Sequence, residues 1–287
     1  MLGTVQFGME YGIANVSGKP SFDRVCEIVR TAYENGVTAL DTAAAYGTSE
    51  EVVGATLARL GLTEAMTVVS KVPPIEADSD QVAETIIERT IRQSLKRLRL
   101  ERLTVCLLHR EDDLRFLPVL EKMVNRGLIG GAGVSLDSGR YLAQAAQAGF
   151  VQLPYNVLDR RFETFWPTAR RNGIRVFSRS VYLQGLLLMP EARIKAELAD
   201  VIPVRRKLEA LARDAGCAMS ELCMRYALLN PTITSVLTGV DTPEQLRENL
   251  RLMALGPLPE DLVSRIRACV PDLPESLVRP ALWHTRR

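Results

Sequence analysis

The chain alternates between short apolar runs and helical patterns along most of its length, and this alternation restricts the folds open to it. Eight runs have the length and the apolar or β-branched content of strands. They are Leu2–Phe7, Val37–Leu40, Thr67–Ser70, Leu103–Leu108, Gly131–Ser135, Phe150–Pro154, Ile174–Ser178 and Ser235–Gly239. Because strands joined by helices pair in parallel, eight such units predict an α/β fold that closes into a single (β/α)8 TIM barrel.

Helical periodicity fills most of the intervals between these runs. In Ser21–Asn35 the apolar positions fall on one stripe that ends before Gly36, and another helical pattern starts at Ser49-Glu50. Further helical patterns cover residues 80–98, 140–148, 162–172, 204–215 and 243–254. We expect a longer loop at 181–203 and a C-terminal extension at 257–287. Since the composition shows no break, residues 1–287 are predicted to form a single domain.

Composition excludes several classes of function. The chain has 287 residues, of which 47% are hydrophobic and 24% charged, and a net charge of +2 gives no reason to expect a nucleic acid or a membrane surface as partner. Its five cysteines form no C-x-x-C pair, so the sequence indicates neither a disulfide framework nor a metal site. No apolar run approaches the roughly 20 residues of a membrane span, and no signal peptide is evident. We therefore expect a cytoplasmic protein whose oligomeric state the sequence leaves open.

Four chemically active side chains follow three of the predicted strands. Asp41 ends the second strand, Lys71 ends the third and His109 follows the fourth, while Tyr46 lies on the loop after Asp41. Parallel strands in a barrel end at one mouth, so the four side chains should meet there. Each has an ordinary alternative when it is taken alone: a helix-capping Asp, a packed Tyr, a surface Lys or a core His.

Together the four side chains suit carbonyl reduction. Hydride transfer to a carbonyl leaves negative charge on oxygen, which requires a proton donor at that atom. A free phenol, with a pKa of about 10, is a poor acid at neutral pH, but a nearby ammonium favours its phenolate form. Lys71 would assist Tyr46 in this way, Asp41 would hold Lys71 charged, and His109 would direct the substrate oxygen. Two other functions stay open: a Schiff-base lyase that uses Lys71, and a cofactor-sensing binding protein with negligible turnover.

Several motifs resemble those of one family. The segment from Asp41 to Glu50, DTAAAYGTSE, is similar to the signature D-T-A-x-x-Y-G-x-S-E of the aldo-keto reductases. Likenesses continue in GTVQFG at 3–8, GLIGGAGVS at 127–135, VQLPYN at 151–156 and GVDTPEQLREN at 239–249. The resemblance implies an NAD(P)H-dependent oxidoreductase in which Asp41, Tyr46, Lys71 and His109 form the catalytic tetrad.

The same resemblance implies a set of cofactor contacts. Ser135 and Gln152 would bind the nicotinamide carboxamide, and the ring of Phe177 would stack on the nicotinamide. The other positions that it assigns to the cofactor are Thr4, Gly239, Asp241, Gln245, Glu248 and Asn249. A helix that begins near residue 242 would also offer backbone N–H groups to a phosphate. A structural alternative is that Ser135 merely ends a strand and that the last three residues lie on the solvated face of a helix.

Three positions depart from the family pattern. Leu136 replaces the usual Asn, and Phe177-Ser178-Arg179-Ser180 replaces an aromatic-Ser-Pro-Leu motif. Asp241 and Thr242 stand where a Ser and often a Lys are expected near the 2′-phosphate of NADP. An acid there would repel that phosphate, although Arg247 would compensate. The resemblance favours NADP(H), and Asp241 keeps NAD(H) open.

Candidate substrate-binding residues are Tyr11, Arg110, Arg179 and Tyr182, with Trp166 as a further candidate to line the mouth. Two arginines near the mouth would suit a carbonyl compound that is anionic or rich in hydroxyl groups, such as a sugar derivative. The structural alternative is that both arginines bridge surface loops.

Overall fold

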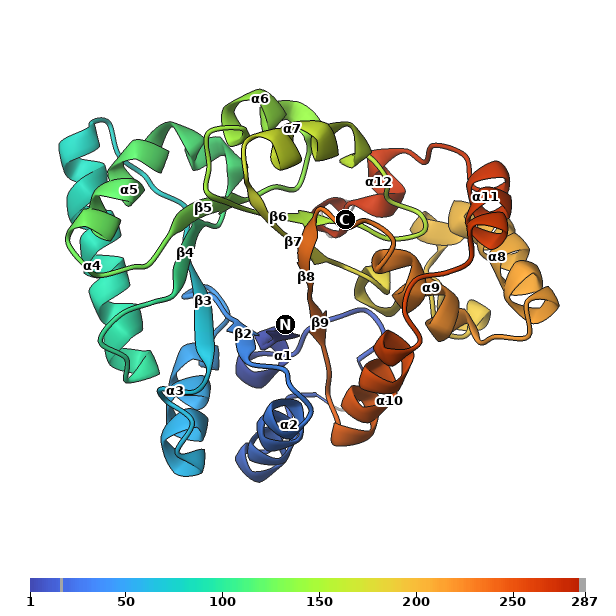
Figure 1. Cartoon of the computed structure of the whole chain (residues 1–287), viewed down its shortest axis with the longest axis horizontal. Coiled ribbons are helices and arrows are strands. Elements are labelled where there is room, and N and C mark those ends of the chain that lie inside the picture. Colours follow the sequence, from blue (N-terminus) through green and yellow to red (C-terminus); the bar gives the residue numbers. More distant parts are fainter. Residues whose placement is uncertain (16–17, 284–287) are drawn as a thin grey trace.

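The computed structural model describes residues 1–15 and 18–283 and contains one parallel sheet that curves into a barrel with helices outside it (Figure 1). The sheet order is β8-β7-β6-β5-β4-β3-β2-β1-β9, and every neighbouring pair is parallel. The strands are β1 (Leu2–Gly3), β2 (Ala39–Asp41), β3 (Thr67–Val72), β4 (Val105–Leu108), β5 (Ala132–Ser135), β6 (Phe150–Pro154), β7 (Arg175–Arg179), β8 (Ile233–Val236) and β9 (Thr238–Gly239). The predicted fold class is therefore confirmed.

The last two strands together act as the eighth strand of the barrel. β8 pairs with β7, whereas β9 pairs with β1, and only Leu237 lies between them. The Leu237 N–H donates to the Ser178 carbonyl at 2.8 Å, and the Thr238 N–H donates to the Met1 carbonyl at 3.3 Å. The unbroken strand predicted at Ser235–Gly239 is thus divided where the chain changes partner, and this change joins the two edges of the sheet.

The first predicted strand, Leu2–Phe7, is wrong beyond Gly3. Val5–Gly8 forms a helical turn, α1, instead of continuing β1. The turn brings Gly8 so close to the loop after β2 that a Cβ on Gly8 would lie 1.8 Å from the Tyr46 carbonyl oxygen. Glycine is the residue that permits such a backbone approach. A buried contact between distant segments has overridden the apolar pattern.

Most predicted helices form close to their predicted bounds, including those at 80–98 and 243–254. The longer helices are α2 (Phe22–Glu34), α3 (Ser49–Leu60), α4 (Asp80–Leu98), α5 (Leu117–Asn125), α8 (Ile202–Asp214), α9 (Met219–Ala227), α10 (Pro243–Ala254) and α11 (Glu260–Cys269). Three more, α6 (Leu142–Ala145), α7 (Trp166–Arg171) and α12 (Glu275–Val278), are short. α5, α9 and α11 were not predicted as helices; α11 lies within the expected C-terminal extension. The expected loop at 181–203 contains only 3-10 turns and the first two residues of α8. Residues 284–287 of the expected C-terminal extension lie outside the described residues.

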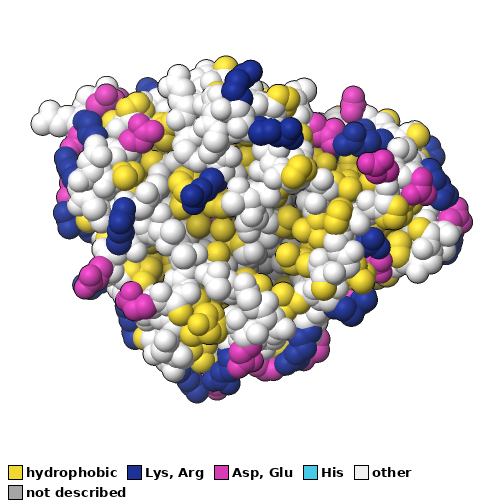
Figure 2. All heavy atoms as spheres, viewed as in Figure 1, with side chains coloured by type: hydrophobic (Ala, Val, Ile, Leu, Met, Phe, Trp, Pro, Cys, Tyr) yellow, Lys and Arg dark blue, Asp and Glu magenta, His cyan; other side chains and the backbone are white. Residues whose placement is uncertain are grey.

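Apolar side chains form an inner and an outer layer. Val69, Val105, Leu107 and Phe177 pack together inside the barrel, while a much larger cluster fills the space between strands and helices. On the face shown in Figure 2, charged side chains of both signs lie mainly around the periphery. Within residues 1–15 and 18–283, no helix has the length and apolar content needed to cross a membrane, and no cluster of His, Cys, Asp or Glu is arranged to hold a metal ion.

Candidate active site

The four predicted catalytic residues lie at the carboxyl ends of adjacent strands. Asp41 is the last residue of β2, Lys71 is the penultimate residue of β3, and His109 directly follows β4. Tyr46 lies on the loop between β2 and α3, where its carbonyl accepts a hydrogen bond from the Ser49 N–H at 3.0 Å. Because β2, β3 and β4 run in parallel, their ends bring these groups to one side of the barrel.

Lys71 and Asp41 form a buried ion pair. The Lys71 Nζ lies 2.8 and 2.7 Å from the two Asp41 carboxylate oxygens and 2.9 Å from the Thr42 carbonyl oxygen. Burial by itself would lower the pKa of Lys71, but the attraction of Asp41 and the interaction with Tyr46 outweigh it and raise the pKa above its ordinary value. Lys71 is therefore a fixed ammonium ion at neutral pH.

Tyr46 lies between this ion pair and His109. The Lys71 Nζ is 5.0 Å from the centre of the Tyr46 ring, and the His109 ring meets it edge-on with 5.5 Å between centres. The backbone on both sides of Tyr46 is fixed by Gly47, which has a φ of 56°, and by the close approach of Gly8. The loop thus presents the phenol to the barrel mouth in one orientation.

His109 is neutral at physiological pH. Burial, together with the positive charges of Lys71 and Arg179, lowers the pKa of His109 to about 3. The Nδ1 atom is buried and has no hydrogen-bond partner among residues 1–15 and 18–283. A neutral imidazole has one donor and one acceptor nitrogen, so His109 is suited to hydrogen bonding with an oxygen in the mouth rather than to carrying charge.

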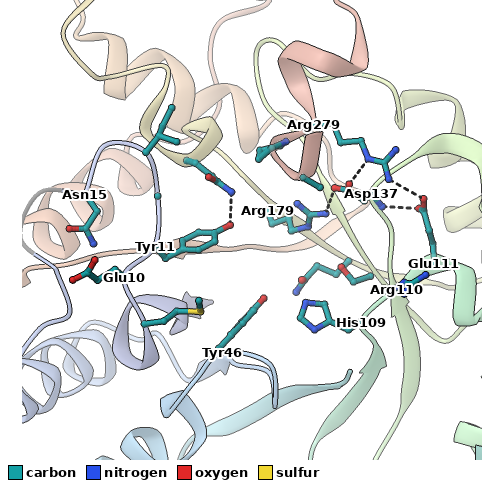
Figure 3. Close-up of a pocket in the computed structure, with 18 of the residues that line it drawn as sticks. Glu10, Tyr11, Asn15, Tyr46, His109, Arg110, Glu111, Asp137, Arg179 and Arg279 are labelled. Atoms are coloured by element: carbon teal, nitrogen blue, oxygen red, sulfur yellow. Dashed lines mark hydrogen bonds and ion pairs between the residues drawn. The ribbon is translucent and has the colours of Figure 1, made fainter. Parts of the chain in front are cut away.

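Two connected cavities open beside Tyr46. The first has a volume of about 950 Å³, and its lining includes Tyr46, His109 and Arg179 (Figure 3). The second, of about 660 Å³, extends from Tyr46 towards the N-terminus of α10. Both are lined by Tyr11, Gly12, Asn15, Tyr46, Gln152, Arg179 and Gln184. Tyr46 and Arg179 therefore stand at the junction of two compartments.

The residues predicted to bind the nicotinamide end of a cofactor have different surroundings. The Gln152 Nε2 atom donates to Asp41 at 2.7 Å, and Ser135 lines the first cavity. The buried Thr4 hydroxyl donates to the Asp41 carbonyl at 2.9 Å and lines the second cavity with Gly239. Phe177 packs inside the barrel against Phe150, with 5.7 Å between ring centres, and is not among the residues that line either cavity. Its stacking role stays a prediction.

The segment around the start of α10 forms the far end of the second cavity, where Asp241, Gln245, Glu248 and Asn249 all line the wall. The Thr242 hydroxyl accepts from the Gln245 N–H at 3.3 Å, and the Gln245 side chain accepts from the Asp241 N–H at 2.7 Å. These two bonds resemble a capping box, except that Gln245 accepts from the residue before the N-cap, and they fix the loop that carries Asp241. Arg247 lies outside this wall and pairs with Glu244 and Glu27.

The substrate-binding candidates separate into three groups. Tyr11, Arg110 and Arg179 line the first cavity, which agrees with their predicted position at the mouth of the barrel. Tyr182 lines only the second cavity, where its hydroxyl donates to Asn249 at 2.8 Å. Trp166 is buried against Tyr155 and is absent from both walls, so the structure does not support the prediction that it lines the mouth. Arg110 forms an exposed ion pair with Asp112 at 3.1 Å.

Sequence reasoning missed a group of charged residues in the first cavity. Glu111, Asp137 and Arg279 line it together with Arg179 (Figure 3). Asp137 follows β5 by two residues, a position typical of functional side chains in such barrels and therefore a usable signal. Arg279 comes from the end of α12 and reaches Asp137 across 142 residues of sequence, which no local pattern reveals.

Comparison with known proteins agrees with the observed fold. The family model described as "Aldo/keto reductase family" matches residues 1–271. An NADH-specific methylglyoxal reductase of Escherichia coli (strain K12) is 25% identical, and the alignment covers 86% of this chain and 90% of that protein. An L-galactose dehydrogenase of Arabidopsis thaliana is 26% identical over 89% of this chain and 87% of its own length.

Solved structures share the fold. Aldo-keto reductase AKR11C1 from Bacillus halodurans, in its holo form, superposes with a TM-score of 0.76 at 20% identity. The superposition covers 95% of this chain and 92% of the other.

Proposed function

The chain belongs to the aldo/keto reductase family and is an NAD(P)H-dependent oxidoreductase, and on that premise we propose that it reduces the carbonyl group of a small, polar aldehyde or ketone. The observation that carries the proposal is the buried Asp41–Lys71 ion pair directly beside the Tyr46 ring, with the neutral His109 on the other side.

Each residue has a separate task in this reaction. Tyr46 donates its phenolic proton to the substrate oxygen as negative charge develops there. Lys71 stabilises the resulting phenolate, and Asp41 keeps Lys71 charged and in place. His109 holds the substrate oxygen near Tyr46 by a hydrogen bond, which a neutral imidazole gives without competing for the proton. The Gln184 side chain donates to the Tyr11 hydroxyl at 2.9 Å, and both residues line the two cavities beside Tyr46.

The second cavity fits a nicotinamide dinucleotide. The side-chain oxygen of Gln6 is buried on its wall with no hydrogen-bond partner among the described residues, and a Cβ on Gly239 would lie 2.5 Å from it. The orphaned oxygen suits a hydroxyl donor such as a ribose. Gln152 uses its nitrogen for Asp41, which leaves its oxygen for a carboxamide N–H. The dinucleotide, when bound, supplies the hydride, and the N-terminus of α10 offers backbone N–H groups at the far end.

We propose NAD(H) rather than the NADP(H) that the family pattern favours. Three carboxylates line the far end of the second cavity, from Asp241, Glu244 and Glu248. Glu244 pairs with Arg247 and Glu248 pairs with Arg251, so Asp241 is the carboxylate there that forms no ion pair with a described residue. Arg247, which would compensate for Asp241, is held outside the cavity by Glu27 and Glu244. The negative charge of Asp241 opposes a 2′-phosphate and suits ribose hydroxyls. The related reductase of E. coli is NADH-specific by name.

The first cavity favours a neutral, hydroxylated substrate over an anionic one. Its described lining has four basic side chains, Arg110, Arg179, Lys195 and Arg279, and four acidic ones, Glu10, Glu111, Asp112 and Asp137. The charges balance, so of the two substrates predicted from the sequence, anionic or rich in hydroxyl groups, the lining favours the second. Many donors and acceptors without net charge suit a sugar-like carbonyl compound, and the related Arabidopsis protein is an L-galactose dehydrogenase.

The Schiff-base alternative is disfavoured by the state of Lys71. A nucleophilic amine has to be neutral, but the pKa of Lys71 is raised and its Nζ is bonded to both oxygens of Asp41. Borohydride treatment in the presence of a carbonyl substrate should leave Lys71 unmodified.

The direct test is a fluorescence titration with NADH and NADPH, followed by a screen of hydroxylated aldehydes monitored by loss of reduced-cofactor absorbance. Tyr46→Phe should bind cofactor nearly as well as the wild type but turn over at least about 100-fold more slowly, because the phenol acts in the transition state. Equal turnover in the variant would contradict the assignment. Cofactor binding without turnover of any carbonyl compound would favour the sensing protein instead.

A further inference from the structure

Asp137 is shared between two arginines that are far apart in the sequence, Arg179 and Arg279. Its Oδ1 accepts a hydrogen bond from Arg179 Nη2 at 2.9 Å, and its Oδ2 accepts one from Arg279 Nε at 2.5 Å (Figure 3). Arg179 ends β7 at the junction of the two cavities, whereas Arg279 follows α12 in the C-terminal segment. The single negative charge of Asp137 is thus divided between two guanidinium groups and offsets only part of the positive charge of each.

The surrounding contacts hold this bridge in place. Glu111 accepts hydrogen bonds from the backbone N–H groups of Asp137 and Ser138 at 2.8 and 2.9 Å. Arg279 also pairs with Glu275 at 3.3 Å and approaches Glu111 at 3.9 Å. Burial would raise the pKa of Asp137, but Arg179 and Arg279 outweigh it and keep the pKa below its ordinary value, so the carboxylate is charged at neutral pH.

Arg179 retains hydrogen-bonding capacity towards the cavities. Apart from Asp137, its guanidinium bonds to the Leu136 carbonyl at 2.9 Å and to the Ser180 hydroxyl at 3.3 Å. A guanidinium has five N–H donors, and these contacts leave donors that no described residue occupies. Its positive charge also contributes to the lowered pKa of His109, which places that charge within electrostatic reach of the reacting groups.

We propose that Asp137 and Arg279 are specificity-determining residues that set how strongly Arg179 attracts an anionic group next to the substrate carbonyl. This inference rests on the proposed function. Asp137 reduces the charge of Arg179 and so favours neutral, hydroxylated carbonyl compounds, while Arg279 competes for the same carboxylate and restores part of that charge. Arg279 acts through Asp137 and Arg179, and is therefore a positioning residue.

The proposal predicts opposite effects for the two residues. Asp137→Asn keeps hydrogen-bond acceptance but removes one negative charge, so Arg179 should attract anions more strongly. In Arg279→Met, Asp137 pairs with Arg179 alone, so the attraction of Arg179 for anions should fall. Arg279→Lys should retain most of that attraction. A residue that merely stabilises the C-terminal segment would impair every substrate in the same direction, whichever partner is changed.

The experiment compares two small aldehydes that differ in the group beside the carbonyl, glyoxylate with a carboxylate and glycolaldehyde with a hydroxymethyl group. We expect the kcat/KM ratio of glyoxylate to glycolaldehyde to rise at least fivefold in Asp137→Asn and to fall at least threefold in Arg279→Met, mostly through KM. Arg265→Met is the matched control, because Arg265 also forms an ion pair in the C-terminal region, with Asp214 at 2.9 Å, but belongs to neither cavity wall. A ratio that stays constant, or that moves the same way in both variants, would overturn the proposal.

A second measurement separates this inference from the proposed function. Calorimetric titration of the cofactor-bound protein with oxamate, an unreactive carboxylate, requires no turnover. Tighter oxamate binding in Asp137→Asn and weaker binding in Arg279→Met would support the inference even if neither aldehyde were reduced, a result that would count against the proposed function alone. Unchanged oxamate affinity in both variants would reject the inference while leaving carbonyl reduction to its own test.

Discussion

Lys71 and Asp41 carry opposite charges where water has almost no access. Both side chains are nearly fully buried, and the ammonium satisfies its three N–H groups with Asp41 and Thr42. Such a pair costs desolvation energy when it forms, but the loss of one member leaves the other charged and buried. Stability and proton donation therefore depend on the same two residues.

Lys71→Met should lower the free energy of unfolding by about 3–5 kcal/mol, since it leaves Asp41 without its cation. Carbonyl reduction should fall at least as far as in Tyr46→Phe. Urea unfolding and turnover assays measure the two effects. The double variant Asp41→Asn/Lys71→Met removes both charges and should recover part of the stability but none of the activity. A stable and active single variant would show that Lys71 has no catalytic role.

His109 makes folding sensitive to acid. The unfolded chain binds a proton on this residue below about pH 6.5, whereas the folded protein resists protonation until about pH 3. Stability is therefore greatest above pH 6.5 and decreases as the pH falls from there towards 3, by up to about 1.4 kcal/mol per pH unit. Urea unfolding at pH 7 and pH 5 should show a larger loss in the wild type than in His109→Gln. Equal losses would mean that His109 titrates normally in the folded state.

At the scale of elements, α3 and α4 come into close backbone contact at Gly54. A Cβ on Gly54 of α3 would lie 2.4 Å from the Arg97 carbonyl oxygen and 2.7 Å from the Leu98 carbonyl carbon of α4. The nearby Glu50 accepts hydrogen bonds from Arg97 at 2.7 Å and from Ser70 at 2.6 Å, which ties the two helices to β3. The glycine determines how closely these helices approach.

Gly54→Ala should therefore destabilise the protein by about 1–3 kcal/mol, even though alanine is the better helix former by about 1 kcal/mol. The matched control is Gly139→Ala, where the nearest atom to the new Cβ would be 3.9 Å away and the change should stay within about 0.5 kcal/mol. Chemical denaturation of both variants gives the comparison. Similar stability in the two would indicate that α3 and α4 can move apart at little cost.

Under the proposed function, we expect the connection between β9 and α10 to influence the choice of cofactor. The hydrogen bonds of Thr242 and Gln245 fix this loop, and Asp241 lines the second cavity beside it. Asp241→Ser should shift the ratio of dissociation constants towards NADP(H) by about tenfold, which corresponds to about 1.4 kcal/mol. Titration of wild type and variant with both dinucleotides measures the shift, and Arg247→Met should have much less effect because Arg247 lies outside the cavity. If the ratio of the two dissociation constants does not change in Asp241→Ser, the 2′-position of the adenosine ribose does not lie beside Asp241.

At the scale of the whole molecule, the second cavity joins segments that are far apart in sequence. Its wall includes residues of β1, the loop after β7, β9 and α10 (Figure 1). The pairing of β9 with β1 closes the barrel at the same place. A ligand bound here would contact β1 and β9 where their pairing closes the barrel, so its binding energy should resist global unfolding.

The preferred dinucleotide at about 100 times its dissociation constant should stabilise the fold by about 2.7 kcal/mol. For a chain of this size the expected rise in Tm is roughly 5 °C. Thermal melts with NADH and NADPH at equal concentration should show the larger shift with NADH. A larger shift with NADPH would reverse the proposed preference, and no shift with either would contradict binding at this cavity.

The sequence by itself determined the fold class and the positions of the four central residues. Both depend on local periodicity and on chain direction: apolar runs of strand length alternate with helical stripes, and the ends of parallel strands lie on one side of a barrel. Asp41, Lys71 and His109 could be placed together for that reason without any knowledge of distances. The bounds of α4 and α10 followed from strong helical patterns at 80–98 and 243–254, and in the structure the side chains of Ser79 and Thr242 cap these helices.

Tertiary structure decided what each charged group faces. The end of β1 at Gly3, the division of the eighth strand at Leu237 and the bridge from Arg279 to Asp137 all arise where distant segments meet. Arg179 and Arg247 have the same side chain, yet one borders both cavities and the other is held outside by two glutamates. Sequence specifies the charge of a residue and its order along a strand, but only packing fixes the distances over which charges interact.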